Sequence, residues 1–273
     1  MWLSMQGSPN PLKPPTRYAV KVYYDGRGYH GFQPQKGLPT IGGTLIEALK
    51  ASGLVASVEE ANFQAASRTD RDVSALGQTI AFNTAESFTV GRLNAHLPGS
   101  IQAWAWARVP RTFNPRREAL RRRYLYVSPY RGESLQSMVE ASTLFTSEKA
   151  LEFGFRPLEA LKVSLQGGFL TFTFTARSFT RGLVRRLTTV LLKAGAEGLK
   201  LDELYQRLKA EGFNRFSSPP SPPSPLILLE VEYGFPFKVD FEAVRRLREK
   251  LSWEAARLEM LRNCLKLFEE KAG

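Results

Sequence analysis

Residues 17–25 read RYAVKVYYD, and aromatic or branched side chains recur there at every second position. This period of two is typical of a β-strand with one face in a core. The same alternation returns at 101–109, and strands are also expected at 78–83, at 123–127 and, as a buried strand, at 226–233. Residues 163–165 and 170–176 flank Gly167-Gly168, which predicts a hairpin turn. The chain is therefore expected to be built on a sheet.

Helical periodicity appears between these strands. A helix is expected at 40–53, with Thr44 and Glu47 as a capping box. An amphipathic helix is predicted at 179–194 and a short one from Asp202 to Lys209. Another amphipathic helix, at 241–268, is expected to pack on the sheet. Strands and helices in two groups indicate the α+β class.

Composition divides the chain near residue 109, where it becomes rich in arginine. We expect a flexible tail at 1–16, an N-terminal domain at 17–108 and a C-terminal domain at 109–273. The second domain contains SSPPSPPSP at 217–225, which must be a loop of polyproline type.

The net charge is +12, from 38 Lys and Arg against 26 Asp and Glu. Residues 108–131 hold eight Arg and one acid, and residues 177–193 hold five bases and no acid. Solvated basic faces are one interpretation of these two windows. Their concentration on an otherwise neutral background favours a footprint for a phosphate backbone.

Cysteine and histidine are scarce, with only Cys264, His30 and His96. This excludes a disulfide framework and a Cys/His zinc cluster, so no metal is expected. A single thiol suits a reducing cytoplasm. Neither a signal peptide nor an apolar run long enough to span a membrane is present, so the protein is expected to be soluble and cytoplasmic.

The sequence GRGYHG at 26–31 matches the G-x-G-x-x-G pattern of dinucleotide sites. That mechanism needs a helix to begin at the last glycine, and Pro34 and Pro39 prevent one. We therefore expect no nucleotide cofactor. The glycine-rich loop can still approach an RNA backbone, with Gln33 beside it.

Residues 67–78, SRTDRDVSALGQ, form the densest polar run. Asp70 lies among arginines, and a carboxylate so placed stays ionised and suits a nucleophile or a base. A polar turn explains the same residues, and Asp70 with Asp72 also resembles a glycosidase pair. In 122–126, Tyr124 and Tyr126 lie beside arginines, which suits stacking on an unpaired base but also suits a core.

Taken in order, these pieces resemble the TruA family of tRNA pseudouridine synthases, in a variant closer to archaeal and eukaryotic members. The resemblance extends from about 17 to 235. The matching segments are 24–33, 68–78, 94–98, 113–116, 123–126, 178–185 and 226–233.

The resemblance implies two ferredoxin-like (RRM-like) α/β halves that form one extended, mainly antiparallel sheet. Helices are expected on one side of the sheet and a basic cleft on the other. It also implies a homodimer that acts on tRNA without cofactor or metal. The implied reaction isomerises uridine to pseudouridine, at positions in the anticodon stem-loop.

Roles for single residues follow from the same resemblance. Asp70 is the implied catalytic residue, and it either attacks C1′ or takes the 2′ proton. Tyr124 stacks on the uracil and receives or relays the C5 proton, and Arg185 pairs with Asp70. Leu226 packs against the base. The other expected RNA contacts are Gln33, Arg68, Arg116, Arg122, Arg123 and Arg181.

Some positions depart from the family pattern. Ser67 stands where the family usually has Gly, and Asp72 stands at another Gly position and adds a negative charge near Asp70. Arg181-Gly182 replaces a His-His pair of bacterial members, and 132–162 looks short. The alternative is a non-catalytic tRNA-binding protein whose site Asp72 has spoiled.

Overall fold

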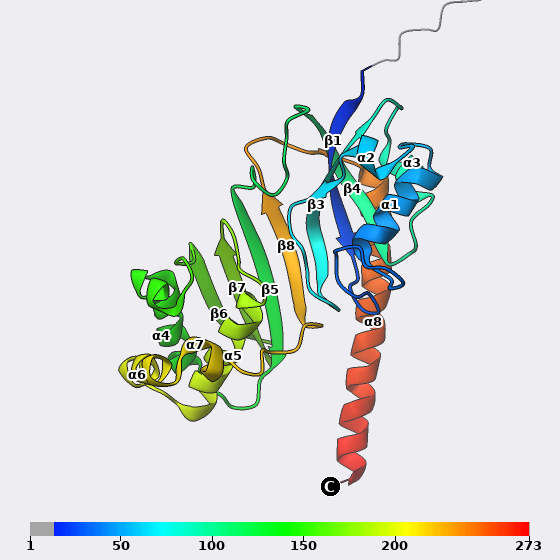
Figure 1. Cartoon of the computed structure of the whole chain (residues 1–273). Helices are drawn as coiled ribbons and strands as arrows, with labels where there is room; N and C mark the ends of the chain where they lie inside the picture. The colour runs from blue at the N-terminus through cyan, green and yellow to red at the C-terminus, as the bar shows by residue number, and fades with distance from the viewer. Residues whose placement is uncertain (1–13, 273) are drawn as a thin grey trace, which may run out of the picture.

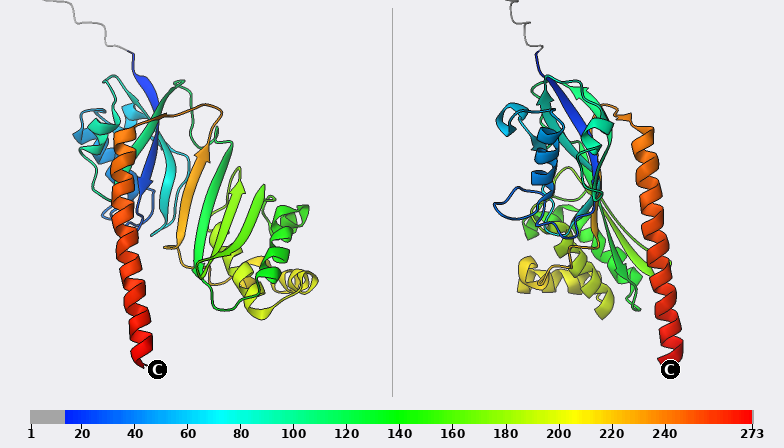
Figure 2. Two further views of the ribbon diagram at one scale, coloured as in Figure 1. Left: turned by 180° about the vertical axis from the view of Figure 1, so that it is seen from behind. Right: turned by 90° about the vertical axis from the view of Figure 1, so that its right-hand side faces the viewer.

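The computed structural model describes residues 14–272, with side chains described as far as residue 264. Most of the expected tail at 1–16 lies outside the described residues. The described chain is mixed α/β, with one large open sheet and helices on both of its faces (Figures 1 and 2).

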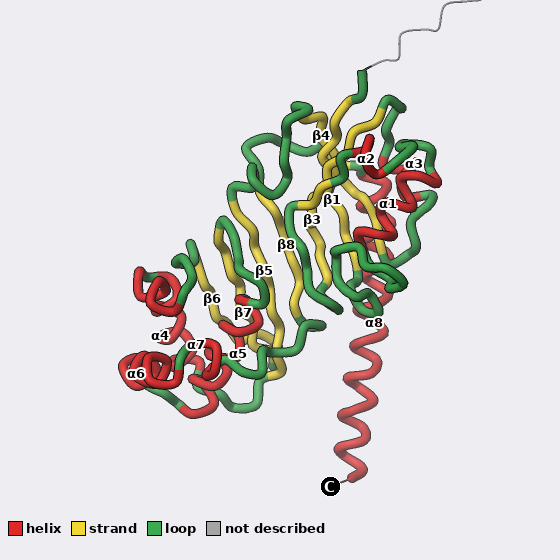
Figure 3. The backbone as a smooth tube through the Cα atoms, viewed as in Figure 1, coloured by secondary structure: helices red, strands yellow, loops and turns green. Residues whose placement is uncertain are grey.

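The sheet has nine strands, and eight of them follow the order β6-β7-β5-β8-β3-β1-β4-β9. Within residues 14–272 every pairing is antiparallel except that of β3 with β8. The strands are β1 (Thr16–Tyr24), β2 (Gln64–Ala65), β3 (Ser74–Thr84), β4 (Ile101–Val109), β5 (Arg121–Pro129), β6 (Ala160–Gln166), β7 (Phe169–Ala176), β8 (Leu226–Glu232) and β9 (Lys238–Val239). Figure 3 shows the seven longer strands, from β6 to β4, side by side.

The helices connect these strands in chain order. They are α1 (Ile41–Ala51), α2 (Val58–Ala61), α3 (Val90–Asn94), α4 (Leu135–Thr146), the 3-10 helix η1 (Glu148–Phe153), α5 (Leu183–Glu197), α6 (Leu201–Glu211), α7 (Phe213–Phe216) and α8 (Phe241–Ala272). The segment at 132–162, expected to be short, thus contains α4 and η1.

Strand alternation predicted the longer strands because apolar side chains recur on the face of the strand that packs in the core. In β1, Tyr18, Val20, Val22 and Tyr24 all lie in the main core. The hairpin of β6 and β7 turns at Gly167 and Gly168 as expected, and both glycines have positive φ.

Helix boundaries were less predictable. The cap of α1 is Thr40, whose hydroxyl accepts from the Gly43 amide at 3.3 Å, so the expected Thr44 and Glu47 capping box was wrong. α5 begins at Leu183 because Gly182, with φ of 70°, interrupts the helical backbone. Residues 179–182 are therefore a loop, and this loop contributes to the site described below.

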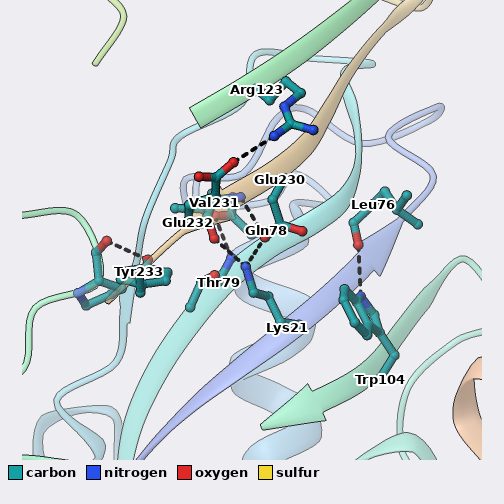
Figure 4. A network of polar contacts seen from close by, with 11 residues as sticks. Lys21, Leu76, Gln78, Thr79, Trp104, Arg123, Glu230, Val231, Glu232 and Tyr233 are labelled. Carbon is teal, nitrogen blue, oxygen red and sulfur yellow. Dashed lines mark hydrogen bonds and ion pairs between the residues drawn. The ribbon is translucent and has the colours of Figure 1, made fainter. Parts of the chain in front are cut away.

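The two groups of strands meet where β3 and β8 pair, through Ser74 with Ile227 and Ala75 with Leu228. Beyond that short pairing the buried ammonium of Lys21, on β1, reaches across to Glu230 and the Val231 carbonyl on β8 (Figure 4). Burial lowers the pKa of Lys21, and the Glu230 carboxylate opposes that effect. This contact ties the N-terminal strands to the C-terminal ones.

The chain after β8 returns to the N-terminal strands. β9 pairs with β4, and α8 lies against β4 on the face opposite α1 and α5 (Figure 2). Ala243 and Leu247 are buried there. Farther along, α8 projects past the sheet, and Trp253 and Leu258 are 72% and 62% exposed. The expected packing of this helix on the sheet is therefore found in its first part, around Ala243 and Leu247.

The expected separation of helices and cleft onto opposite faces also differs from the structure. The main pocket is lined by the first turn of α5 and by the loop that leads to α1. Both helices lie on the same face of the sheet (Figures 1 and 2), and α8 covers part of the other.

Candidate active site

A cavity of about 1290 Å³ opens between the N-terminal and C-terminal groups of strands. Ligand pockets for drug-sized molecules have volumes of roughly 300–1000 Å³, so this cavity is larger than a typical small-molecule pocket. Ten arginines line it, against one carboxylate, that of Asp70. The lining comes from the loops at 30–35, 66–73, 116–119 and 177–182, with strand β5 beneath.

The loop that carries Asp70 joins β2 to β3 and is held by hydrogen bonds at the residues just before Asp70. The Thr69 carbonyl accepts from the Phe32 amide at 3.0 Å, and the Thr69 hydroxyl contacts the Tyr24 hydroxyl at 2.8 Å. The Gln78 side chain accepts from the Ser67 amide at 3.2 Å and donates to its carbonyl at 2.8 Å. Polar residues at 67–78 thus fix the backbone around Asp70.

Two glycines of the 26–31 loop let the backbone come close to the Asp70 loop. A Cβ on Gly26 would lie 2.2 Å from the Val73 carbonyl oxygen. A Cβ on Gly31 would lie 3.0 Å from the Thr69 carbonyl oxygen, and Gly31 has φ of +87°. The glycine pattern therefore serves loop packing, and no helix begins at Gly31.

Two guanidinium groups face the Asp70 carboxylate. Nη1 of Arg185 lies 3.7 Å from Oδ2, and Nε of Arg181 lies 3.7 Å from Oδ1. The Arg185 side chain is 22% exposed and is anchored where its Nε donates to the Ser221 carbonyl at 2.6 Å. The Arg181 side chain is 95% exposed. Arg185 is thus held in place beside Asp70, whereas the exposed Arg181 side chain can move to another partner.

Tyr124 lies on β5 at the floor of the same cavity. It is buried, and its ring meets that of Phe179 edge-on with centroids 5.1 Å apart. Burial raises the pKa of the Tyr124 phenol, although the Ser67 hydroxyl and Arg122 oppose this. The phenol is therefore neutral at ordinary pH. Leu226, also buried, adds an apolar wall.

The other residues expected to bind RNA fall into two groups. Gln33, Arg68 and Arg116 are exposed and line the cavity. Arg123 does not line it: it pairs with Glu232 at 2.7 Å, as Figure 4 shows. Because side chains alternate along β5, Arg123 faces away from the side occupied by Tyr124. Arg122 is on the Tyr124 side but is 6% exposed.

Asp72 adopts the left-handed conformation that its glycine counterpart would favour, with φ of 62°. Its carboxylate accepts from the Gly28 amide at 3.2 Å and lies 3.4 Å from Nε of Arg71. Asp72 is not part of the cavity lining. The Asp72 carboxylate therefore stabilises the 26–31 loop and does not face the cavity.

Several residues that line the cavity are not marked by any of the sequence motifs. Arg117, Arg177 and Arg186 lie within the two basic windows, and this position alone could have predicted that they line the site. Arg156 follows η1, which the sequence did not reveal, and nothing marked it. His30 lines the cavity from the glycine-rich loop.

The site combines a carboxylate between guanidinium groups, a neutral tyrosine on an apolar floor and a rim of arginines. This combination suits a class of protein that binds an RNA backbone and isomerises a nucleotide held out of its stack, the RNA pseudouridine synthases.

Comparison with known proteins gives the same class. A family model described as tRNA pseudouridine synthase matches residues 136–234. A tRNA pseudouridine synthase A of Thermococcus sibiricus is 34% identical over 245 residues, covering 86% of this chain and 91% of the relative. That of Methanococcoides burtonii is 32% identical over 263 residues, covering 91% and 95%. That of Methanothermobacter thermautotrophicus is 34% identical over 233 residues, covering 82% and 83%.

These similarities cover most of both partners in each comparison, and the relatives are archaeal. The chain belongs to the TruA family of tRNA pseudouridine synthases. Among the residues that the structure describes, no helix is long and apolar enough to cross a membrane.

Proposed function

We propose that the protein isomerises uridine to pseudouridine in the anticodon stem-loop of tRNA, with Asp70 as its catalytic residue. The bond from C1′ to N1 breaks, the uracil turns, and a bond from C1′ to C5 forms. C5 loses its proton and N1 gains one, so the product is an isomer of the substrate. The observation that carries the proposal is the single carboxylate among the ten arginines of the cavity lining.

Asp70 has two routes open to it, attack on C1′ or removal of the 2′ proton, and both use the carboxylate anion. Arg185 supports that anion from a fixed position, because Ser221 holds its Nε. Arg181 reaches the same carboxylate from an exposed loop. An incoming phosphate competes for Arg181 more easily than for Arg185, so RNA binding exposes one side of Asp70 to the ribose.

Tyr124 and Leu226 form the proposed seat of the target base. A flat uracil stacks on the phenol ring while Leu226 excludes water from the other side. The raised pKa of Tyr124 keeps its phenol protonated, so it begins the cycle as a hydrogen-bond donor near C5. This is consistent with a relay role in loss of the C5 proton.

Arginines of the rim supply the RNA-binding energy in this proposal. Taking a nucleotide out of its stem costs a few kcal/mol, which contacts to neighbouring phosphates must offset. Arg68, Arg116 and Gln33 line the cavity and are exposed, which suits such contacts. Arg123 pairs with Glu232 outside the cavity, so this proposal gives it no contact to the target nucleotide.

The sheet suggests how the halves divide. Strands β3, β1 and β4 with α1 form one proposed ferredoxin-like half, at 17–108. Strands β6, β7, β5 and β8 with α4 and α5 form the other, within 109–273. In this proposal the active enzyme is a cytoplasmic homodimer, as the family resemblance implies.

The test is release of tritium from tRNA transcripts that carry uridine labelled at C5. We expect release that reaches a fixed stoichiometry per tRNA, with the modified position in the anticodon stem-loop. No release from any transcript, together with tight and salt-sensitive binding, would contradict the proposal and favour a non-catalytic tRNA-binding protein.

A further inference from the structure

Arg122 is the most extensively bonded side chain at the floor of the cavity. Its Nε donates to the Ser67 hydroxyl at 3.0 Å. Its Nη2 donates to the Ala66 carbonyl at 2.8 Å and to the Arg116 carbonyl at 2.9 Å, and its Nη1 donates to the Arg177 carbonyl. Four acceptors therefore meet on one guanidinium.

These acceptors come from three separate loops. Ala66 and Ser67 precede Asp70 in its loop, Arg116 lies in the loop before β5, and Arg177 begins the loop that carries Arg181. Each of the three loops lines the cavity. Arg122 itself is part of β5, next but one to Tyr124, so the connection runs from the rigid sheet to all three loops.

The accessibility of Arg122 argues against a direct role in RNA binding. The residue is 6% exposed, and its guanidinium is committed to protein acceptors. Burial lowers the pKa of Arg122, although an arginine remains charged at any ordinary pH. A buried cation without carboxylate partners is costly unless its donors are satisfied, and here the four acceptors satisfy them.

We infer that Arg122 is a positioning residue, which holds the Asp70 loop, the Arg116 loop and the Arg181 loop in one arrangement around the substrate. This inference rests on the proposed function and corrects the expectation that Arg122 contacts RNA. The planar fork of arginine can reach acceptors in several directions at once. A lysine at this position keeps the positive charge. Its single ammonium cannot donate to all three loops at once, as the guanidinium does.

The decisive variant is Arg122→Lys, with Arg121→Lys as its matched control. Arg121 precedes it on β5, is half exposed, and pairs with Glu159 at 3.3 Å outside the cavity. Each variant exchanges one guanidinium for one ammonium and leaves the net charge unchanged. Single-turnover pseudouridine formation at saturating enzyme separates the rate from tRNA binding, which is measured by filter retention over a range of salt.

We expect Arg122→Lys to slow the saturated rate by about 10- to 100-fold, because displacements near 1 Å cost about that much in catalysis. The dissociation constant for tRNA should stay within about threefold, with an unchanged salt slope, because no phosphate contact is lost. Hydrogen exchange should become faster at 66–72, 114–118 and 177–182. Arg121→Lys should match the wild type in all of these.

Three results would overturn the inference. One is a saturated rate equal to that of the wild type, and another is weaker tRNA binding with a shallower salt slope and an unchanged rate. The third is global unfolding of Arg122→Lys, which would make Arg122 a general stability element. If the wild type forms no pseudouridine, the proposed function fails. The hydrogen-exchange rates of Arg122→Lys and the wild type then still decide whether Arg122 fixes the loops.

Discussion

Replacing Gly26 with alanine tests how closely catalysis depends on the packing of the Asp70 loop. The new Cβ would lie 2.2 Å from the Val73 carbonyl oxygen and 2.5 Å from its carbon. Side-chain Cβ contacts under 3.0 Å are essentially not seen, so residue 26 and the Val73 carbonyl must move apart by at least the difference from 2.2 Å, which is about 0.8 Å.

This displacement occurs three residues from Asp70, in a loop whose Asp70 carbonyl accepts from the Val73 amide at 3.2 Å. Overpacking of a well-filled site costs about 1–3 kcal/mol of folding free energy. A shift near 1 Å at a catalytic group lowers the rate by about 100-fold. We therefore expect Gly26→Ala to fold, to melt at a lower temperature and to lose most of its activity.

The assay is single-turnover pseudouridine formation, run beside thermal unfolding by circular dichroism. Gly99→Ala is the control, because a Cβ there meets nothing within 4 Å. The control should keep its rate and melting temperature. If Gly26→Ala is folded and its saturated rate stays within about twofold of the wild type, the reasoning from loop packing to catalysis is refuted.

Three further perturbations test other parts of the account. Tyr124→Phe should bind tRNA normally and react at least about tenfold more slowly in single turnover, since it removes the proposed proton relay; an unchanged rate would exclude that role. Arg181→Gln should weaken tRNA binding and reduce the salt slope by about one unit, whereas an unchanged slope would mean that Arg181 contacts no phosphate. Burial raises the pKa of Tyr24, Tyr124 and Tyr233 above the ordinary 10.0, so these phenols stay neutral in the folded state while the unfolded chain ionises. Their contribution to stability is complete below pH 10 and is lost as the pH rises toward the folded pKa values, so the melting temperature should fall steeply above about pH 10; a flat profile to about pH 11 would contradict this.

The strands could be predicted from the sequence because their signal is local. In β1 every second side chain from Tyr18 to Tyr24 is apolar and buried, and this alternation needs no knowledge of the partner strands. The partners themselves were not predictable from periodicity. The parallel pairing of β3 with β8 joins residues about 150 positions apart, and only the family resemblance implied a single sheet.

Helix ends and packing depended on features that periodicity does not contain. The apolar pattern of α5 continues back to Phe179, but Gly182 takes a positive φ and turns 179–182 into the loop that carries Arg181. For α8, the pattern of apolar residues correctly predicted a helix. It could not show that the sheet ends before the helix does, which leaves Trp253 exposed.

The site was partly predictable. The polar run around Asp70 and the arginines of the second window were both evident, and the structure brings Asp70, Arg181 and Arg185 together. Alternation along β5 would have separated Arg123 from Tyr124 and placed Arg122 on the side of the tyrosine. Whether Arg122 meets RNA or protein depends on loops far away in the sequence, and the sequence pattern does not contain that information.

The most direct test of the central claim compares Asp70→Asn with Asp72→Asn in the tritium-release assay. Both variants remove one carboxylate charge from the same loop, but only Asp70 lines the cavity. The account predicts that Asp70→Asn binds tRNA and releases no tritium, whereas Asp72→Asn keeps close to the wild-type rate. Turnover by Asp70→Asn near that of the wild type would contradict the assignment of Asp70 as the catalytic residue.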